Sequence, residues 1–527
     1  MVIRRPLRTR ASGQRSGTGG PPWDPAIEPL IRSHRAAHPR ADMALLARAY
    51  LVAEREHRGQ MRQSGLPFIT HPLEVTMLVA ALGMDTTTLV ASLLHDTVED
   101  TGYTLDLARA EFGDEVALLV DGVTKLDKLT FGAAAEAETI RKMLVAMGRD
   151  PRVLVIKLAD RVHNMRTLGA KSRPSQVRIA RATLEVLAPL ADRLGIQVFR
   201  RELEDLALAI LHPPEYEQLV RLTARRVPQR QRYLATVIEP LEADLRAARV
   251  RATVRDHPRH AFSVYETIIQ RGGSITDVYD NARVLIVIDG DASGCYTTLG
   301  MVHARWTPVS GRFKDFIALP KFNFYQSLHT SIVGPLDQLI DVQIRTEAMQ
   351  RTAEYGIAAN PAAVAERADD LRWLTRLLDW QRFASDPAEF LEALSFDLVE
   401  EEVLVFLPDG EALSLPTDAT PVDAAYALST EIGNRCVGAR VNGRLVPLSR
   451  PLQDGDVVEV LTSTVRHHGP SREWLRFVKS PKAHVAIRQW MADTGQFPAI
   501  GSDTDADDGP GSEGDTQIEE VGSDAGA

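Results

Sequence analysis

Apolar positions from about residue 24 to residue 211 recur at the spacing of helix faces. Two series carry the pattern: Leu46, Tyr50, Ala53 and His57, and later Leu184, Leu187 and Leu190. Glycines such as Gly83, Gly102 and Gly113 divide the segments. The apolar run at 152–158 is too short for its pattern to separate a strand from a buried helix, and its helical surroundings favour a helix. This region is therefore predicted to be all-helical.

The pattern becomes mixed from about residue 214 to residue 360. Short apolar runs at 284–288, 316–319 and 339–344 predict buried strands. A stretch of helical period at 296–306 lies between the first two runs. Strands that alternate with helices predict an α/β domain with a mixed sheet and helices on a face.

Residues 402–463 show a third pattern. Four short strand-like segments alternate with turn signals at Asp409-Gly410, Asn442-Gly443 and Asp454-Gly455. One helix is predicted from about 422 to 432. These features predict a small β-rich module.

Both ends of the chain are rich in Gly, Ser and charged residues, a composition that predicts disorder. The chain is therefore expected to be multidomain, with six segments: a disordered start at 1–23, a helical domain at 24–211, an α/β domain at 212–385, a β-rich domain at 400–464, a short helical extension at 465–496 and an acidic disordered tail at 497–527.

Composition narrows the function classes. The 527 residues are 44% hydrophobic and 25% charged, as in globular proteins. No apolar run approaches the roughly 18 residues of a membrane helix, and no apolar core follows the arginines near the start, so neither a membrane span nor a secretory signal is expected. Cys295 and Cys436 are far apart in the sequence, which excludes a CxxC zinc site and fits a reducing cytoplasm.

The charge is unevenly distributed. The net charge is −10, and residues 501–527 hold nine acidic side chains with no Lys or Arg. Net charge therefore gives no case for a nucleic-acid binder.

Four side chains with metal-ligand atoms stand in short polar motifs. They are His71 in ITHP, the adjacent pair His95 and Asp96 in HDTVEDT, and Asp160 in KLADRVHN. Imidazole nitrogen with carboxylate oxygen suits Mn, Fe, Zn or Mg. A lone His-Asp pair occurs by chance, but the set of four is the ligand pattern of HD phosphohydrolases, in which a metal orients a phosphate and activates water.

Polar residues near these four are candidate partners. On a helix Glu99 lies on the side of Asp96, so this carboxylate or its neighbour Asp100 could act on an attacking water. Asn164 and Thr167 follow Asp160 on one helical face and could contact a substrate.

Together these segments resemble the hydrolase domain of the RelA/SpoT homologue family, whose members make and destroy guanosine tetra- and pentaphosphate. The motifs are HRGQMRQSG at 57–65, HP at 71–72, HDTVEDT at 95–101, GVTKL at 122–126 and KLADRVHNMRTL at 157–168. The resemblance implies three sets of residues: Mn²⁺ ligands His71, His95, Asp96 and Asp160; Glu99 and Asp100, which serve the attacking water; and Arg62, Asn164 and Thr167, which contact the guanosine nucleotide.

Residues 256–360 carry cations beside strand patterns, and Asp280 and Asp341 could hold Mg²⁺ between phosphates. This stretch resembles the synthetase domain of the same family, which moves pyrophosphate from ATP to the 3′-hydroxyl of GDP or GTP. The resemblance implies Asp280 as a Mg²⁺ ligand. It implies synthetase roles for Arg259, His260 and Asp341, and an acceptor-nucleotide motif of Arg312, Lys314, Lys321, Asn323, Tyr325 and His329.

Several positions depart from the synthetase pattern. The family's GRPKH segment is Asp256 to His260 here, so that an arginine is replaced by His257 and a lysine by Arg259. A further lysine is Thr267, an arginine falls on Leu285, and a glutamate is Asp341. These changes lie where the family binds ATP, so synthesis is expected to be weakened while GDP or GTP binding is kept.

Residues 402–463 resemble the family's TGS domain, a β-grasp-like module that helps to sense translation through tRNA and the ribosome. The module's own basic cluster is small: Arg435, Arg440 and Arg444. An RNA partner is therefore implied by the resemblance alone.

The leading interpretation is a cytoplasmic guanosine-3′,5′-bis(diphosphate) 3′-pyrophosphohydrolase of the stringent response with an impaired synthetase domain. One alternative is a bifunctional enzyme with an active synthetase. Another is a translation-linked regulator that senses nucleotides without synthesis. A generic HD nucleotidase is disfavoured because the motifs around Arg62 and Asp160 are more specific than the His-Asp pair.

Overall fold

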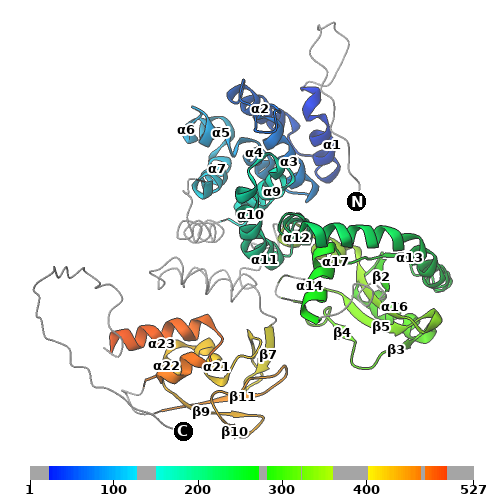
Figure 1. Cartoon of the computed structure of the whole chain (residues 1–527), viewed down its shortest axis with the longest axis vertical. Helices are drawn as coiled ribbons and strands as arrows, with labels where there is room; N and C mark the ends of the chain where they lie inside the picture. The colour runs from blue at the N-terminus through cyan, green and yellow to red at the C-terminus, as the bar shows by residue number, and fades with distance from the viewer. Residues whose placement is uncertain are drawn as a thin grey trace, which may run out of the picture. The chain divides into compact units, whose positions relative to one another are not determined.

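The computed structural model describes residues 23–127, 150–271, 282–321, 323, 325–359, 402–463 and 469–494. Its backbone groups into two compact units, Met1–Glu400 and Glu401–Ala527 (Figure 1). The predicted disordered ends and Asp280 lie outside the described residues. None of the described helices is both long enough and apolar enough to cross a membrane.

The first unit begins with packed helices, as predicted. They are α1 (Glu28–Ala37), α2 (Met43–Glu56), α3 (Thr70–Ala81), α4 (Thr86–Leu94), α5 (Thr97–Asp100), α6 (Leu105–Phe112), α7 (Asp114–Asp127), α9 (Arg152–Arg166), α10 (Arg173–Ala182), α11 (Ala188–Arg193) and α12 (Gln197–Leu211), with short turns η1 (Pro25–Ile27), η2 (Leu168–Ala170) and the π-helical η3 (Thr183–Leu187). The run at 152–158 is helical, and every side chain of α9 from Val153 to Asp160 is buried. Because this part of α9 is buried on all sides, its apolar residues show no helical period, and their pattern did not separate a helix from a strand.

Several of these helices begin at acidic or hydroxyl side chains that accept hydrogen bonds from the first turn. Asp42 accepts from Ala44 N and Leu45 N at the start of α2, and Asp85 accepts from Thr88 N at the start of α4. Such caps satisfy backbone donors that have no partner within the helix.

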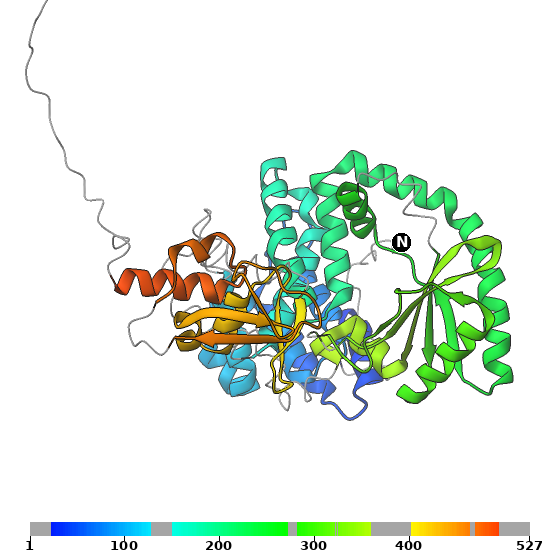
Figure 2. The same ribbon diagram turned by 90° about the horizontal axis from the view of Figure 1, so that it is seen from below.

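The long helix α13 (Pro213–Ala247) leads into a mixed sheet, also as predicted. The sheet contains β1 (Ala252–Asp256), β2 (Ala282–Ile288), β3 (Thr307–Pro308), β4 (Lys314–Asp315), β5 (Leu328–Val333) and β6 (Leu339–Thr346), and its helices are α14 (Ala261–Arg271), α16 (Ala292–Arg305), η4 (Pro335–Asp337), α17 (Glu347–Tyr355) and η5 (Gly356–Ala359). The strand order is β1-β2-β6-β5-β3, with β4 paired to β5 and only β2 parallel to β6 among these pairs. Figure 2 shows α13 passing around the outside of this sheet.

The predicted strand at 316–319 is wrong. These residues form a turn after the short strand β4, because the Asp315 carboxylate accepts hydrogen bonds from Ile317 N and Ala318 N at 2.9 Å each. Backbone donors that a strand would offer to its neighbour are taken by this side chain.

One face of the sheet packs on α13 and α16. Val284 and Ile286 of β2 and Val342 and Ile344 of β6 belong to that core. Because side chains alternate along a strand, the residues between them point to the opposite face, which is largely polar.

The helical and sheet regions of the first unit meet at two glycines. Gly195 follows α11 and Gly356 follows α17, and a Cβ on Gly356 would lie 1.9 Å from Leu194 O. Ile357 N donates to Leu194 O at 3.0 Å. The side chains of Ile357 and Ala358 complete the core of the helical region, so the end of the sheet region is anchored in that core.

The second unit is the small module. It contains β7 (Glu402–Phe406), β8 (Ala412–Pro416), α21 (Pro421–Leu428), α22 (Thr430–Asn434), β9 (Cys436–Val441), β10 (Arg444–Val446), β11 (Val458–Thr462), η7 (Arg472–Arg476) and α23 (Pro481–Asp493). The sheet β10-β9-β11 is antiparallel, β7 pairs with β8, and a parallel bridge joins Phe406 to Val457.

The single helix predicted from 422 to 432 is wrong in one respect. Ser429 is extended and divides it into α21 and α22, because its side chain accepts a hydrogen bond from Ile432 N and starts the second helix. The buried Asp423 of α21 accepts hydrogen bonds from Lys479 N and Ser480 N, which ties the C-terminal helical extension to the module.

Candidate active site

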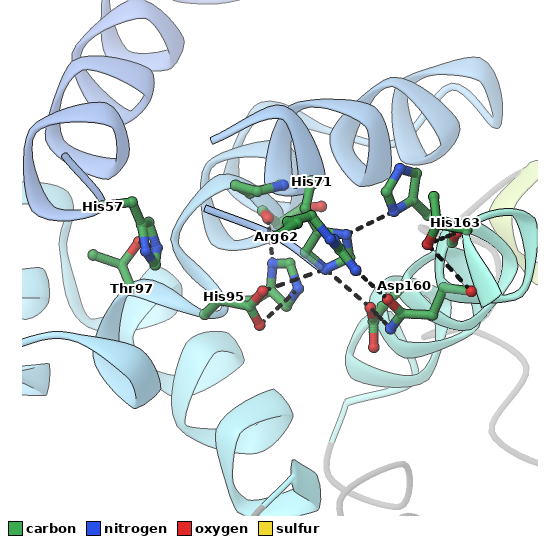
Figure 3. Close-up of polar contacts among 12 residues, drawn as sticks. His57, Arg62, His71, His95, Thr97, Asp160 and His163 are labelled. Carbon is green, nitrogen blue, oxygen red and sulfur yellow. Dashed lines mark hydrogen bonds and ion pairs between the residues drawn. The ribbon is translucent and has the colours of Figure 1, made fainter. Parts of the chain in front are cut away.

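The four predicted metal ligands meet at one point in the helical region. Figure 3 shows three of them, His71, His95 and Asp160. His71 Nε2 lies 3.3 Å from Asp96 Oδ2 and 3.2 Å from Asp160 Oδ1, and His95 Nε2 lies 3.0 Å from Asp96 Oδ1. The ligand atoms of His71, His95 and Asp96 all lie within 4.8 Å of one another. His71 stands in the first turn of α3, Asp160 on α9, and the His-Asp pair in the break between α4 and α5.

Each histidine uses its other ring nitrogen away from this point. His95 Nδ1 lies 2.7 Å from the backbone oxygen of Ser92, which can only accept, so His95 Nδ1 carries a proton. Its Nε2 is buried and makes no hydrogen bond among the described residues. His71 Nδ1 lies 2.7 Å from Nδ1 of His163. Both Nε2 atoms therefore face the carboxylates.

The ionised carboxylates around this point favour the binding of a cation. Burial opposes ionisation of Asp96, but His95 and His71 hold the pKa of Asp96 at about 2. Burial likewise opposes ionisation of Asp160, while Lys157 and His71 hold its pKa well below the usual range. Burial lowers the pKa of His71, yet its contacts with Asp160 and Asp96 outweigh that effect and raise it. Two ionised carboxylates with two imidazoles are a fitting donor set for a divalent metal.

The predicted substrate residues Arg62 and Asn164 lie beside this set. Arg62 Nη2 donates to Asn164 Oδ1 at 2.9 Å, and Asn164 Nδ2 donates to Asp160 Oδ1 at 2.5 Å. Arg62 Nη1 is buried without a hydrogen-bond partner among the described residues. Thr167 lies at the end of α9, where its hydroxyl donates to the carbonyl oxygens of His163 and Asn164.

Glu99 and Asp100 form the end of α5, directly after Asp96. The loop with Arg62 is fastened to this helix, because Gln60 Nε2 donates to Asp100 O at 3.2 Å. Gln60 Oε1 also accepts from Nδ1 of the buried His57 at 2.7 Å, and the His57 ring stacks on Phe68 with the ring centres 4.4 Å apart. The loop and the short acidic helix are thus held together at one side of the four ligands.

A second group of predicted residues lies on the polar face of the sheet. Strand pairing places Lys314 of β4 opposite His329 of β5, and His329 opposite Gln343 of β6. Tyr325 Oη lies 2.7 Å from His329 Nε2. Burial and the nearby Arg345 lower the pKa of His329 to about 3, so His329 is a neutral polar group at pH 7.

Asp341 lies in the next row of the same face. Its Oδ1 accepts from Ser331 Oγ at 2.7 Å, and its Oδ2 lies 3.6 Å from Arg283 Nε. Arg283 is two residues before Leu285 on β2 and points to the same face. A guanidinium therefore reaches this face although Leu285 itself is fully buried and apolar.

The remaining predicted synthetase residues are more dispersed. His260 Nε2 lies 2.6 Å from Glu204 Oε2 on α12, and Asn323 Nδ2 donates to Asp192 O at 3.2 Å. Arg259 Nη1 donates to Thr267 Oγ1 at 3.2 Å. Arg312 is exposed in a turn, and Lys321 Nζ lies 5.0 Å from the centre of the Phe316 ring.

Sequence reasoning gave no role to Lys157 or His163. Both side chains are buried on α9, three residues before and three residues after Asp160. Lys157 Nζ donates to Asp160 Oδ2 at 2.8 Å. Their spacing from Asp160 places all three residues on one side of the helix. This spacing was the one feature of the motif that could have indicated their proximity to Asp160.

Family models match three parts of the chain. An HD domain matches residues 49–197, a region found in RelA / SpoT proteins matches 256–362, and a TGS domain matches 403–462. The chain is 53% identical over 509 residues to the bifunctional (p)ppGpp synthase/hydrolase RelA of Mycobacterium tuberculosis, covering 94% of this chain and 68% of that protein. The chain belongs to the RelA/SpoT homologue family.

Other members of the family are similar. The chain is 54% identical over 510 residues to a GTP pyrophosphokinase of Streptomyces coelicolor, covering 92% of this chain and 60% of that protein. It is 43% identical over 465 residues to the bifunctional (p)ppGpp synthase/hydrolase SpoT of Escherichia coli, covering 86% and 65%. The chain thus spans 60% to 68% of the lengths of these relatives. The resemblance to the family is confirmed, as are its three kinds of domain.

Proposed function

We propose that this chain removes the 3′-pyrophosphate of guanosine tetra- and pentaphosphate, with Mn²⁺ held by His71, His95, Asp96 and Asp160. The observation that carries the proposal is the convergence of two Nε2 atoms and two carboxylates at one buried point. A bound divalent ion supplies Lewis acidity toward a phosphate oxygen and toward water.

The chain's own residues would do the rest. Arg62, held by Asn164, offers the buried donor Nη1 to a phosphate oxygen. Glu99 or Asp100, at the end of the helix that Asp96 starts, accepts the proton of the attacking water. Thr167 would contact the nucleotide through its oxygen, since its hydroxyl hydrogen is directed to the helix carbonyls.

The test is pyrophosphate release from guanosine tetraphosphate with and without Mn²⁺. The Asp96→Ala variant should lose turnover, because it removes a ligand. Asp106→Ala is the matched control, since Asp106 is an exposed carboxylate on α6 that pairs with Arg109. Full activity of the Asp96→Ala variant would show that the assigned site is wrong.

We further propose that synthesis of these nucleotides from ATP is weaker than hydrolysis. Burial and the neighbouring Arg345 and Arg201 lower the pKa of His257 to about 4, so the group at a family arginine position is uncharged at pH 7. The guanidinium of Arg259 is engaged by Thr267. A loss of positive charge over ATP phosphates removes transition-state stabilisation directly.

A bifunctional enzyme is the second candidate. Arg283 favours it, because its guanidinium lies beside Asp341 on the polar face of the sheet. It adds a positive charge to this face, which the apolar Leu285 does not provide. The two candidates are separated by guanosine tetraphosphate formation from ATP and GDP in the Asp96→Ala background, where product is not destroyed. A rate similar to wild-type hydrolysis would favour the bifunctional enzyme.

The TGS module is proposed to contact tRNA or the ribosome, as in the family, which would place the enzyme in the cytoplasm and in the stringent response. Two members of the predicted basic cluster would make this contact: Arg440, exposed on β9 and 3.2 Å from Glu459, and Arg444 on β10. The third member, Arg435, donates to the Ser463 carbonyl oxygen within the module. Binding of the isolated chain to deacylated tRNA, compared with an Arg440→Ala/Arg444→Ala variant, tests this part.

A further inference from the structure

The contact between His71 and His163 joins two buried imidazoles. Their Nδ1 atoms are 2.7 Å apart, and the side chains come from different helices, α3 and α9. The two residues are 3% and 9% exposed. At this separation one Nδ1 donates a proton and the other accepts it.

The surroundings of His71 decide the direction. Its Nε2 faces Asp96 and Asp160, the place where a cation would be held. When Nε2 gives its lone pair to a cation, the single ring proton of a neutral imidazole resides on Nδ1. His71 Nδ1 then donates, and His163 Nδ1 accepts.

We infer that His163 is a positioning residue of the hydrolase centre, which holds the ring of His71 with Nε2 toward the metal by accepting a hydrogen bond from its Nδ1. The inference rests on the proposed function, since it assumes that the four ligands hold a metal. His163 itself contacts neither metal nor substrate in this assignment.

The two ligand imidazoles are supported in different ways. His95 donates to the Ser92 backbone oxygen at 2.7 Å, which no side-chain substitution removes. His71 depends on a side chain. A carboxylate or carbonyl partner is the usual support of a metal-bound imidazole, and His163 fills that place with a ring nitrogen. The orientation of His71 can therefore be changed by one substitution outside the ligand set.

The geometry supplies matched variants. In asparagine Oδ1 is the same number of bonds from the backbone as Nδ1 in histidine, so His163→Asn keeps an acceptor near His71. His163→Leu places a methyl group there and keeps much of the bulk. His34→Leu is the control for the loss of a buried histidine, because His34 lies on α1 and contacts Thr86 and His38 instead of the ligand set.

The experiment measures Mn²⁺ binding by calorimetry on the full chain without substrate, with thermal unfolding in EDTA as the check of folding. His163→Leu should weaken Mn²⁺ binding about 10–100-fold, as substitutions of such supporting groups do. His163→Asn should stay within a few fold of wild type. At saturating Mn²⁺ the leucine variant should recover most of its kcat, because its defect is in holding the metal.

Equal Mn²⁺ affinities of the leucine and asparagine variants would overturn the inference alone. A wild-type chain that binds no Mn²⁺ would overturn both the inference and the proposed function. If the leucine variant does not fold, His163→Gln replaces it, because glutamine is polar and carries its acceptor one bond farther out. Glutamine should then bind Mn²⁺ more weakly than asparagine, and equal affinities would again overturn the assignment.

Discussion

Lys157 Nζ donates to Asp160 Oδ2 at 2.8 Å, and the two side chains are 5% and 7% exposed. This buried ion pair leaves Oδ1 of Asp160 for His71 and Asn164. Lys157 thus fixes which oxygen of the carboxylate faces the proposed metal. It also keeps that carboxylate ionised inside the protein.

Replacing Lys157 by methionine should therefore leave the buried Asp160 carboxylate without its lysine partner, while its contacts with His71 and Asn164 remain. The free energy of unfolding at pH 7 in EDTA should fall by about 3 kcal/mol, the lower end of the range for breaking a buried pair. Since the pKa of Asp160 rises in the variant, the carboxylate protonates as the pH falls, and the loss should shrink between pH 7 and pH 4.5. Urea unfolding of both proteins at pH 7 and pH 4.5 measures this loss of stability. An equal loss at the two pH values would indicate a packing defect instead.

Glu99→Gln separates proton transfer from metal binding. If Glu99 serves the water, the variant should bind Mn²⁺ like wild type while kcat falls by roughly 10²–10⁴. Calorimetry and steady-state hydrolysis give the two numbers. Glu111→Gln, at an exposed position at the end of α6, is the matched control. Loss of Mn²⁺ in parallel with rate would make Glu99 a ligand.

The sequence predicted the fold classes and singled out the four side chains proposed as metal ligands, because both depend on local pattern. Helical spacing and the motifs around His71, His95 and Asp160 are visible in one dimension. The partners of these ligands are not: His163 meets His71 only because α9 packs against α3, 92 positions away in the sequence. The sequence did place His163 three residues after Asp160, on the same side of the helix. That spacing is equally typical of an ordinary buried helix face, so it did not identify His163 as a partner of His71.

The errors at 316–319 and at Ser429 have one cause. In each case a side-chain oxygen, of Asp315 or of Ser429, takes backbone donors and starts a turn or a helix inside an apolar run. The pattern of apolar residues along a sequence contains no information about such hydrogen bonds. Strand register likewise places Arg283 opposite Asp341, so a guanidinium lies on the face where the sequence comparison found the apolar Leu285 in place of an arginine.

Gly356→Ala tests the junction within the first unit. Gly356 has a φ of +52°, and a Cβ would lie 1.9 Å from Leu194 O and 2.5 Å from Gly195 C. Because both neighbours are backbone, the free energy of unfolding should fall by about 2–4 kcal/mol. Gly300→Ala on α16 is the control, since a Cβ there meets nothing within 4 Å, and it should be neutral or stabilising by up to about 1 kcal/mol. Similar urea midpoints for the two variants would contradict the close approach.

The buried histidines of the sheet make stability depend on pH. The pKa of His257 is about 4 and that of His329 about 3, both lowered chiefly by burial. In the unfolded chain each has a pKa near 6.5. The unfolded state therefore binds more protons below pH 6.5, so stability should decrease as the pH falls from 6.5 toward 4, by up to about 1.4 kcal/mol per pH unit for each histidine. Urea unfolding at pH 7 and pH 5 should show a shallower dependence in a His257→Gln/His329→Gln variant, and identical dependences would refute the assignment.

Restoring the family's charges should raise synthesis. Pyrophosphoryl transfer depends on positioning and charge neutralisation, with little covalent chemistry from the protein. His257→Arg would place a permanent cation where the imidazole is now neutral, and Thr267→Lys would add a second cation. Asp341→Glu would extend the carboxylate by about one C–C bond. A displacement on the order of 1 Å can lower the rate of catalysis by ~10²-fold. In the Asp96→Ala background the triple variant should therefore form guanosine tetraphosphate from ATP and GDP on the order of 10² faster than the unrestored protein. Thr267→Lys alone should help least, because it replaces the hydroxyl that now accepts from Arg259 with a like charge. The bifunctional enzyme would instead be supported if the Asp96→Ala protein already synthesised at the rate of wild-type hydrolysis and the triple variant were no faster. In that case the cations already present, Arg283 among them, suffice.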